Sequence, residues 1–489
     1  MKFRFKGGLI FLTFILFSWV SFGQLENYPL SDKKKQILAY SLKNNTHPHL
    51  FSTVNFFLKD SVKKKFLFSP IIDLTSGFGL DNQIPYSLAI GAKSQIQLNN
   101  RWTIILNYAA LNESPEKHID NLQDSLGIAL GVGYTKQYKD NTFSHYYSGV
   151  INYKASEYFD FELGRSKNFW GDGYRSLILS NNASPYPYLK INTKVWNIRY
   201  VNLWAQMQER FDDDKQYKYI AFHALSWNIT SQLNVSFYES VIWQSKDSIN
   251  SRGLDINYFN PVIFYRPVEH ALGSADNVLV GASVNYQINK KTLVYSQILL
   301  DEFLFKEVKA RSGWWANKYG LQIGIKAFNF FNSGIDIQTE LNYARPFTYS
   351  HGSVLQNYGH QHQSIAHPLE TNFVEWTNNI RFSKEKWEIN NNFIWAIFGR
   401  DEYGKNQGGT IYKPYTNVEN IYGNYLAQGR KKTIVSNRLT FDRFINDKRS
   451  MRIGLTNLCR YEGNNSENEL NIYLFLQVKF NPIPRNFNR

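Results

Sequence analysis

Hydrogen-bonding side chains and aromatic rings are concentrated in one short stretch, GRSKNFWGDGYRSLILSNNASPYP, which runs from Gly164 to Pro187. Sugars are bound by this combination, because their hydroxyl groups need directional partners while their ring faces stack on aromatic side chains. The directional groups are Arg165, Asn168, Asp172, Arg175, Asn181 and Asn182, and the rings are Phe169, Trp170, Tyr174 and Tyr186. The glycine spacing and Lys-Ser/Thr ending of a nucleotide-binding loop are absent. The stretch predicts either a sugar-binding surface or a polar network inside a fold, since each unpaired polar group would cost about 1–3 kcal/mol.

The start of the chain predicts export. Three basic residues within the first six precede an apolar run from Leu9 to Val20, and Ser21-Phe22-Gly23 has the small-x-small pattern of a cleavage site. We expect residues 1–23 to be a signal peptide, with the mature chain beginning at Gln24.

The remaining composition is typical of a transmembrane β-barrel. No apolar run after the signal is long enough for a membrane-spanning helix, and aromatic residues make up 16% of the chain, with 32 Tyr and 36 Phe. The single cysteine, Cys459, cannot form an intrachain disulfide, and no Cys/His spacing indicates structural zinc. Strand pairing and packing must therefore stabilise the fold.

Apolar and polar residues alternate in many segments, as they do in strands with one apolar and one polar face. In the C-terminal run ELNIYLFLQVKF, every second residue from Leu470 to Phe480 is apolar, and Asn471 and Gln477 lie between them. The run VLVGASVNYQIN repeats the pattern from Val278. A chain of 489 residues is long for one soluble sandwich, so we expect an all-β fold, an outer-membrane antiparallel β-barrel of about 18 strands.

We divide the chain into three parts. Residues 1–23 are the signal peptide, residues 24–65 a periplasmic or plug segment with a short helix from Ser31 to Asn45, and residues 66–489 the barrel with its extracellular loops. Tryptophans near strand ends should anchor the barrel at the two membrane interfaces. They are Trp102, Trp196, Trp243, Trp376 and Trp387.

The charge balance favours an anionic partner. The formal net charge is +15, and removal of the three positive charges of the signal leaves +12. For an exported barrel we expect acidic surface polysaccharide or lipopolysaccharide and no nucleic acid. The alternative is a set of scattered cations that serve solubility and bind acidic lipid headgroups.

Catalysis and metal binding are not expected. His351, His360, His362 and His367 fall in one loop-like run, but no carboxylate stands at a matching spacing for a metal site. Asp301 and Glu302 are adjacent, so in a strand they would point to opposite faces and form a poor acid–base pair. No motif calls for a cofactor.

Four ordered runs resemble the Wzi-like capsule-assembly family of outer-membrane proteins, in particular its branch linked to gliding motility in Bacteroidetes. The first is the stretch from Gly164 to Pro187. The others are YFNPVIFYRPVEHALGSADN, QILLDEFLFKEVKARSGWWANKYGLQIG and YARPFTYSHGSVLQNYGHQHQSIAHPLETNFVE. The resemblance covers most of the mature chain.

The resemblance implies an eighteen-stranded barrel with a helical N-terminal element near the periplasmic mouth. It also implies a non-catalytic role in which the outer loops bind surface polysaccharide as a lectin does. Alternatively, the barrel would be a structural partner of a surface adhesin or of a gliding or secretion complex. Matching positions give candidate residues for polysaccharide binding or a lumen network: Arg165, Asn168, Trp170, Asp172, Arg175, Asn181, Asn182, Arg266, Glu269, Arg345, Tyr349, His360 and His367.

Overall fold

The computed structural model describes residues 47, 50–51, 66–138, 141–211, 214–246, 252–261, 276–446, 450–464 and 468–483. The predicted signal peptide and the predicted helix from Ser31 to Asn45 lie outside these residues. Of the predicted plug segment, the structure describes only His47 and the short strand β1 (Leu50–Phe51).

Within the described residues, eighteen strands pair into one closed antiparallel ring, which confirms the predicted fold class. The strands are β2 (Phe66–Gly79), β3 (Tyr86–Gln97), β4 (Trp102–Ser114), β8 (Asn141–Lys154), β9 (Phe159–Ser166), β11 (Tyr186–Val195), β12 (Ile198–Phe211), β13 (Asp214–Asn228), β14 (Leu233–Gln244), β15 (Asn277–Asn289), β16 (Thr292–Glu302), β17 (Lys318–Phe330), β18 (Ile335–Ala344), β21 (Phe373–Lys384), β22 (Trp387–Arg400), β23 (Arg430–Phe444), β24 (Met451–Asn464) and β25 (Asn468–Phe480).

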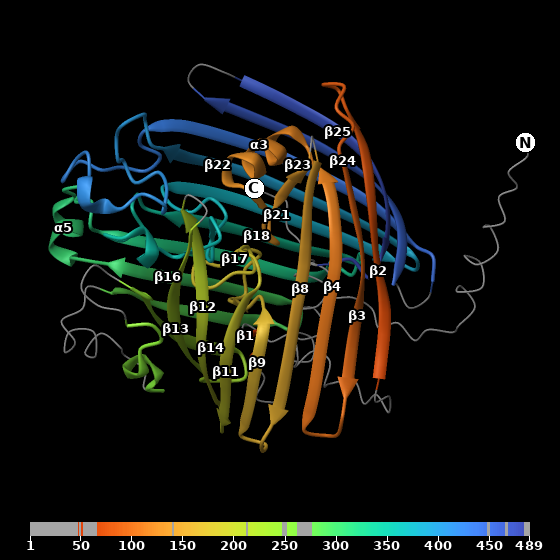
Figure 1. Cartoon of the computed structure of the whole chain (residues 1–489), viewed down its shortest axis with the longest axis horizontal. Helices are drawn as coiled ribbons and strands as arrows, with labels where there is room; N and C mark the ends of the chain where they lie inside the picture. The colour runs from red at the N-terminus through yellow and green to blue at the C-terminus, as the bar shows by residue number, and fades with distance from the viewer. Residues whose placement is uncertain are drawn as a thin grey trace, which may run out of the picture.

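The ring closes where the last strand meets the first. β25 pairs with β2 from Phe480 opposite Ile72 to Tyr473 opposite Gly79. In Figure 1 the wall runs from orange at β2 to blue at β25, and these two strands lie side by side. No helix among the described residues is long and apolar enough to cross a membrane.

The predicted alternation sets the two faces of the wall. In β25, Leu470, Leu474 and Leu476 are exposed on the outside, whereas Asn471 and Gln477 are buried inside. The exposed leucines face apolar lipid, and Gln477 donates to Asp442 at 2.7 Å inside the lumen. The period of two is therefore confirmed for this strand.

The wall has a short-turn end and a long-loop end. Turns such as 196–197 and 385–386 lie at the end that holds the start of β2 and the end of β25, whereas connections 167–185, 345–372 and 401–429 lie at the other end. In outer-membrane barrels short turns face the periplasm and long loops face outward.

Four of the five tryptophans expected at membrane interfaces are exposed on the barrel: Trp102, Trp196, Trp376 and Trp387. The prediction for Trp243 was wrong. Its ring is fully buried against Tyr258, and its Nε1–H donates to the carbonyl of Gly253 at 3.0 Å. A segment that includes η2 (Ile256–Phe259) covers this outer part of β14, which strand periodicity could not reveal.

The smaller elements lie in the connections, and one of them, Lys136–Tyr138, also pairs with β8 in the barrel sheet. They are α3 (Lys117–Leu126), β5 (Ile128–Ala129), β6 (Gly133–Tyr134), β7 (Lys136–Tyr138), β10 (Phe169–Trp170), α5 (Phe305–Ala310), η3 (Val354–Gln356), β19 (Gly359–His360), β20 (Gln363–Ser364) and η4 (Tyr415–Asn417). β1 pairs with β10, so Leu50 and Phe51 reach the segment that follows β9.

Candidate functional site

The connection after β9 folds into the barrel. Residues 171–180 are all buried, and so is most of the connection 345–372 that follows β18. Hydrogen bonds join the two connections. The Ser180 N–H donates to the Ile365 carbonyl at 2.7 Å, and Tyr349 Oη donates to the Leu177 carbonyl at 2.6 Å. Together these two connections, here called the lumen plug, fill the interior beside β9 to β18.

The pair Arg175 and Glu375 lies at the centre of the lumen plug. Arg175 Nε and one terminal nitrogen donate to the two carboxylate oxygens of Glu375 at 3.3 and 3.0 Å. Their side chains are only 4% and 1% exposed. His367 Nε2 lies 2.8 Å from the same carboxylate, and Asn342 donates to it at 3.3 Å. A two-pronged buried pair of this kind fixes the loop to β21 with defined geometry.

A second carboxylate, Glu340 on β18, holds the backbone of the same loop. It accepts the N–H groups of Tyr174 and Arg175 at 2.7 and 3.0 Å and the hydroxyl of Tyr295 at 2.8 Å. Gln322 on β17 donates to the Arg175 carbonyl at 3.1 Å. Buried loop backbone thus obtains from the wall the partners that water would otherwise supply.

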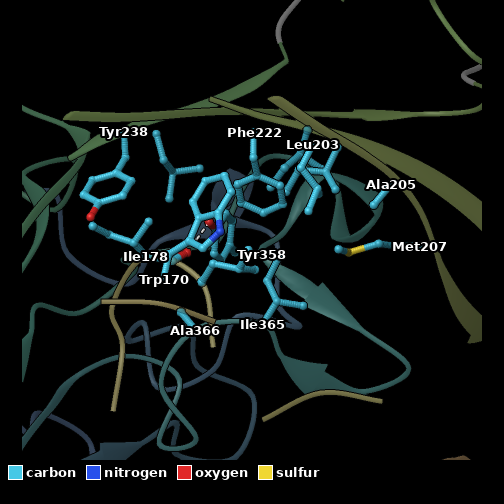
Figure 2. Close-up of a cluster of buried hydrophobic side chains, with 14 of the residues drawn as sticks. Trp170, Ile178, Leu203, Ala205, Met207, Phe222, Tyr238, Tyr358, Ile365 and Ala366 are labelled. Atoms are coloured by element: carbon cyan, nitrogen blue, oxygen red, sulfur yellow. Dashed lines mark hydrogen bonds between the residues drawn. The ribbon is translucent and has the colours of Figure 1, made fainter. Parts of the chain in front are cut away.

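Trp170 belongs to an apolar cluster between the lumen plug and the wall (Figure 2). The indole is 1% exposed and packs edge-on against Phe222 of β13, with ring centroids 5.6 Å apart. Figure 2 shows Ile178, Tyr358 and Ile365 of the two connections facing Trp170. No ring face of Trp170 is open to a sugar.

The remaining polar candidates of the first connection also bind protein groups. Asn168 accepts from Lys190 at 3.1 Å, and Asp172 accepts from Asn285 at 2.9 Å. The Asn181 carbonyl accepts from Lys167 at 3.2 Å, and Asn182 Nδ2 donates to the Ser364 carbonyl at 2.8 Å.

Two lysines of the wall complete the polar network. Lys190 pairs with Glu162 at 2.6 Å across β11 and β9. Lys218 pairs with Glu209 at 3.2 Å and donates to Asn357 in the lumen plug at 2.6 Å. All four charged side chains are at most 2% exposed, so pairing is what makes their burial possible.

The candidates in the second connection differ in depth. Tyr349 is fully buried and stacks on Tyr358, and its backbone N–H donates to the Asp301 carboxylate at 2.8 Å. Arg345 lies nearer the long-loop end, where it donates to the carbonyls of Trp314 and Asn424 at 3.4 Å each.

The histidine run forms ordinary contacts. His360 Nδ1 accepts from the Gln208 N–H at 3.1 Å, and burial lowers the pKa of its imidazole well below the usual range. His362 Nδ1 lies 3.0 Å from the Leu126 carbonyl. Among the residues that the structure describes, no three His, Cys, Asp or Glu side chains are grouped closely enough to hold a metal ion.

The adjacent acids Asp301 and Glu302 share one cation. Lys318 Nζ lies 3.0 Å from Asp301 and 3.2 Å from Glu302, next to a register shift between Leu300 and Glu302 in the pairing of β16 with β17. The irregularity lets both carboxylates reach the same side, which regular strand geometry does not allow.

Arg165 lies apart from the network. In β9, Glu162 faces inward, and Leu163, which is 59% exposed, faces outward. Arg165 is two positions from Leu163, so its side chain also starts from the outer face of the wall. Arg266 and Glu269 lie outside the described residues.

Sequence reasoning missed the carboxylates that receive the loop. Glu340, Glu375 and Glu162 stand on the polar faces of strands, in runs such as DIQTELNY and FVEWTNN. Their signal in the sequence was a carboxylate on the polar, inward face of a strand.

The geometry defines an outer-membrane type of β-barrel whose lumen is occupied by its own outer connections. The family described as Capsule assembly protein Wzi matches residues 134–386, just over half of the 489 residues, and the chain belongs to that family.

Several solved structures are similar in outline. OccK8 (OprE) of Pseudomonas aeruginosa has a TM-score of 0.46 and 9% identity, over 85% of this chain and 97% of that one. OccAB2 of Acinetobacter baumannii has a TM-score of 0.45 and 9% identity, over 84% and 97%. No curated protein sequence matches the chain.

Proposed function

We propose that this protein is a non-catalytic component of capsule assembly in the outer membrane, which binds surface polysaccharide at its long-loop end. The observation that carries the proposal is an exposed aromatic and cationic surface on connections 303–317 and 401–429 with the start of β23, here called the outer shelf. In this proposal the lumen plug supports the outer shelf and does not itself touch polysaccharide.

Backbone hydrogen bonds hold the outer shelf together. The Trp315 N–H donates to the Ile421 carbonyl at 3.0 Å, and the Gly423 N–H donates to the Ser312 carbonyl at 2.8 Å. Gly313 has a φ of +65°, and a Cβ there would lie 2.7 Å from the Asn424 backbone nitrogen. Only glycine allows this close approach at that backbone conformation. Figure 1 shows α5 beside the blue connection between β22 and β23.

The outer shelf has the groups that an acidic sugar chain needs. Phe305, Tyr403, Tyr422 and Tyr425 are each more than half exposed, so their ring faces are accessible for stacking. Lys306, Lys309, Arg311 and Lys431 are also exposed, and no ion pair joins them to another described residue. Unpaired cations beside open rings favour a polyanionic glycan.

Closure of the lumen supports a binding role over transport. The lumen plug fills the interior beside β9 to β18 with buried hydrogen-bonded chain, and α3 covers part of the other side, where Glu116 accepts from Arg438 at 2.7 Å. Moving the lumen plug out of the barrel interior would cost free energy, because it would break the buried charged pairs that hold the plug to the wall.

The test uses variants that leave the lumen plug intact. We expect Tyr422→Ala with Tyr425→Ala, and separately Lys306→Gln with Lys309→Gln, to assemble normally while polysaccharide is shed from the cells into the medium. The matched control is Lys290→Gln with Lys384→Gln, which removes two exposed cations at the short-turn end.

The readouts are heat-modifiable migration for assembly and immunoblotting of cell-bound against released polysaccharide. In the Lys306→Gln with Lys309→Gln variant, polysaccharide binding should also depend less on salt concentration, because exposed charges are screened beyond about 8 Å at physiological ionic strength. Normal retention of polysaccharide in both shelf variants would contradict the proposal.

Association with a surface adhesin, or with gliding or secretion proteins, stays a prediction. Recovery of a stoichiometric protein partner with the detergent-solubilised barrel would support it, whereas co-purifying glycan alone would support the outer shelf as the binding surface.

A further inference from the structure

The wall of the barrel is incomplete near its long-loop end. β8 pairs with β4 over its whole length, but β9 accompanies it only between Gly149 and Lys154. On the other side, β12 pairs with β13 up to Phe211 but with β11 only up to Ala205. In Figure 1, β9 ends well below the top of β8. β7 pairs with the same edge of β8 only from Asn141 to Phe143. Among the described residues, no full strand therefore lies between the upper parts of β8 and β12, and we call this place the seam.

Connections from the long-loop end bridge the seam from within. The Gln361 N–H donates to the Gln208 carbonyl at 2.9 Å, and the Gln208 N–H donates to His360 Nδ1 at 3.1 Å. These bonds satisfy the open edge of β12, which would otherwise present unpaired backbone groups to lipid.

Arg165 lies at the base of the seam, on the outer face. Along β9 it continues the row of Phe159, Phe161 and Leu163, all of which are exposed. Its guanidinium carbon is 4.5 Å from the centroid of the Tyr147 ring, and Tyr147 is itself 52% exposed on β8. The ring holds the cation against the wall.

Arg165 has no anionic partner in the described protein. No carboxylate of a described residue lies within ion-pair distance, and its Nε is buried without a hydrogen-bond partner. Arg175, ten positions along, shows the usual solution for a buried arginine, with a carboxylate on both prongs.

The depth of Arg165 makes the missing anion significant. At about 3.3 Å per residue and a tilt of about 40°, it stands roughly 15 Å above Phe159, in an apolar band about 25 Å tall. It therefore lies in the outer half of the membrane, from where a long side chain reaches toward the headgroups.

Neighbouring groups on the outer face of the seam are polar as well. Gln206, Gln208 and Arg210 take the outward positions of β12 above its last pair with β11, and Tyr108 Oη lies 2.9 Å from His145 Nδ1. The outward positions of β25 from Leu470 to Phe480 are all apolar. Lipid tails do not favour such a surface, whereas a phosphate with its adjoining sugar does.

The geometry points to a site at the seam for the phosphate group of an outer-leaflet lipid, with Arg165 as its cationic ligand and Tyr147 as the ring that orients it. This site is separate from the outer shelf, and it does not depend on polysaccharide binding. Arginine suits phosphate because its planar fork donates two parallel hydrogen bonds.

The test measures lipid retained by the purified full-length barrel. Native mass spectrometry with bis-phosphorylated lipid A should show one lipid per barrel, and Arg165→Gln should weaken binding by about tenfold or more, since hydrogen bonds to charged groups are among the strong ones. The matched control is Arg443→Gln, because Arg443 also lies against an aromatic ring, Trp387, but at the short-turn end. It should bind as the parent does.

A second variant protects the test from misfolding. Tyr147→Leu keeps an apolar outer position and Arg165 itself, and we expect binding to fall while heat-modifiable migration stays normal. Dephosphorylated lipid A and inorganic phosphate are the remaining probes. Neither probe should bind the barrel, or displace the phosphorylated lipid from it, at the concentration at which that lipid saturates the barrel.

Four results would overturn the inference: equal binding of dephosphorylated lipid A, displacement of the lipid by inorganic phosphate, unchanged binding in Arg165→Gln, or equal loss in Arg443→Gln. Retention of a polypeptide at the seam in place of lipid, detected by cross-linking from Tyr147, would also overturn it.

Discussion

Replacement of Arg175 by alanine should release the lumen plug from the wall. The variant removes both hydrogen bonds to Glu375, at 3.3 and 3.0 Å, from side chains that are 4% and 1% exposed. Breaking such a buried pair typically costs about 3–5 kcal/mol, because the remaining charge is left without its partner. His367 and Asn342 still contact Glu375, so we expect about 3 kcal/mol.

Equilibrium unfolding in urea, with the barrel refolded into lipid vesicles, measures this loss. The control is Lys405→Ala, which breaks an exposed pair with Glu402 whose side chains are 45% and 43% exposed. Its effect should be much smaller than that of Arg175→Ala, because solvent screens an exposed pair. In the Arg175→Ala background, Glu375→Gln should recover part of the loss, since it removes the stranded charge. A loss under about 1 kcal/mol for Arg175→Ala, or full additivity of the two changes, would refute the reasoning.

Three further outcomes are expected. Leu474→Arg on the outer face should cost roughly 2–4 kcal/mol if the position lies near the membrane midplane, while Gln477→Ala, which loses one hydrogen bond to Asp442 at 2.7 Å, should cost about 1 kcal/mol in the same unfolding assay. Planar bilayers should show no large, steady conductance from the purified protein, and deletion of residues 352–366 should raise it; large conductance from the parent would count against a filled lumen. Burial lowers the pKa of His360 below its unfolded value of about 6.5, so the unfolded chain takes up the proton first and the stability present above pH 6.5 is lost as pH falls below it. His360→Gln should flatten that decline, and an unchanged pH profile would exclude His360 as its source.

Short windows of sequence predict which strand residues of the barrel wall face lipid and which face the lumen, because the two faces alternate with a period of two. The row of alternate apolar residues ending at Phe480 predicts which side of β25 meets lipid, and the structure places Leu474 outside and Gln477 inside. Local periodicity fails where a connection packs onto the wall. Trp243 looked like an interface anchor, but a segment around Tyr258 buries it.

The stretch from Gly164 to Pro187 shows what the sequence leaves undecided. Its composition indicates hydrogen-bonding groups that need partners, but it contains no period, so neither the direction nor the depth of a side chain follows from it. β9 extends to Ser166, so Arg165 belongs to the outer face of a strand. Arg175 lies in the connection that turns inward, and it pairs there with a carboxylate 200 positions away. Residue types determined which contacts were possible; only closure of the barrel, which brings β9, β18 and β21 around one lumen, decided which of them formed.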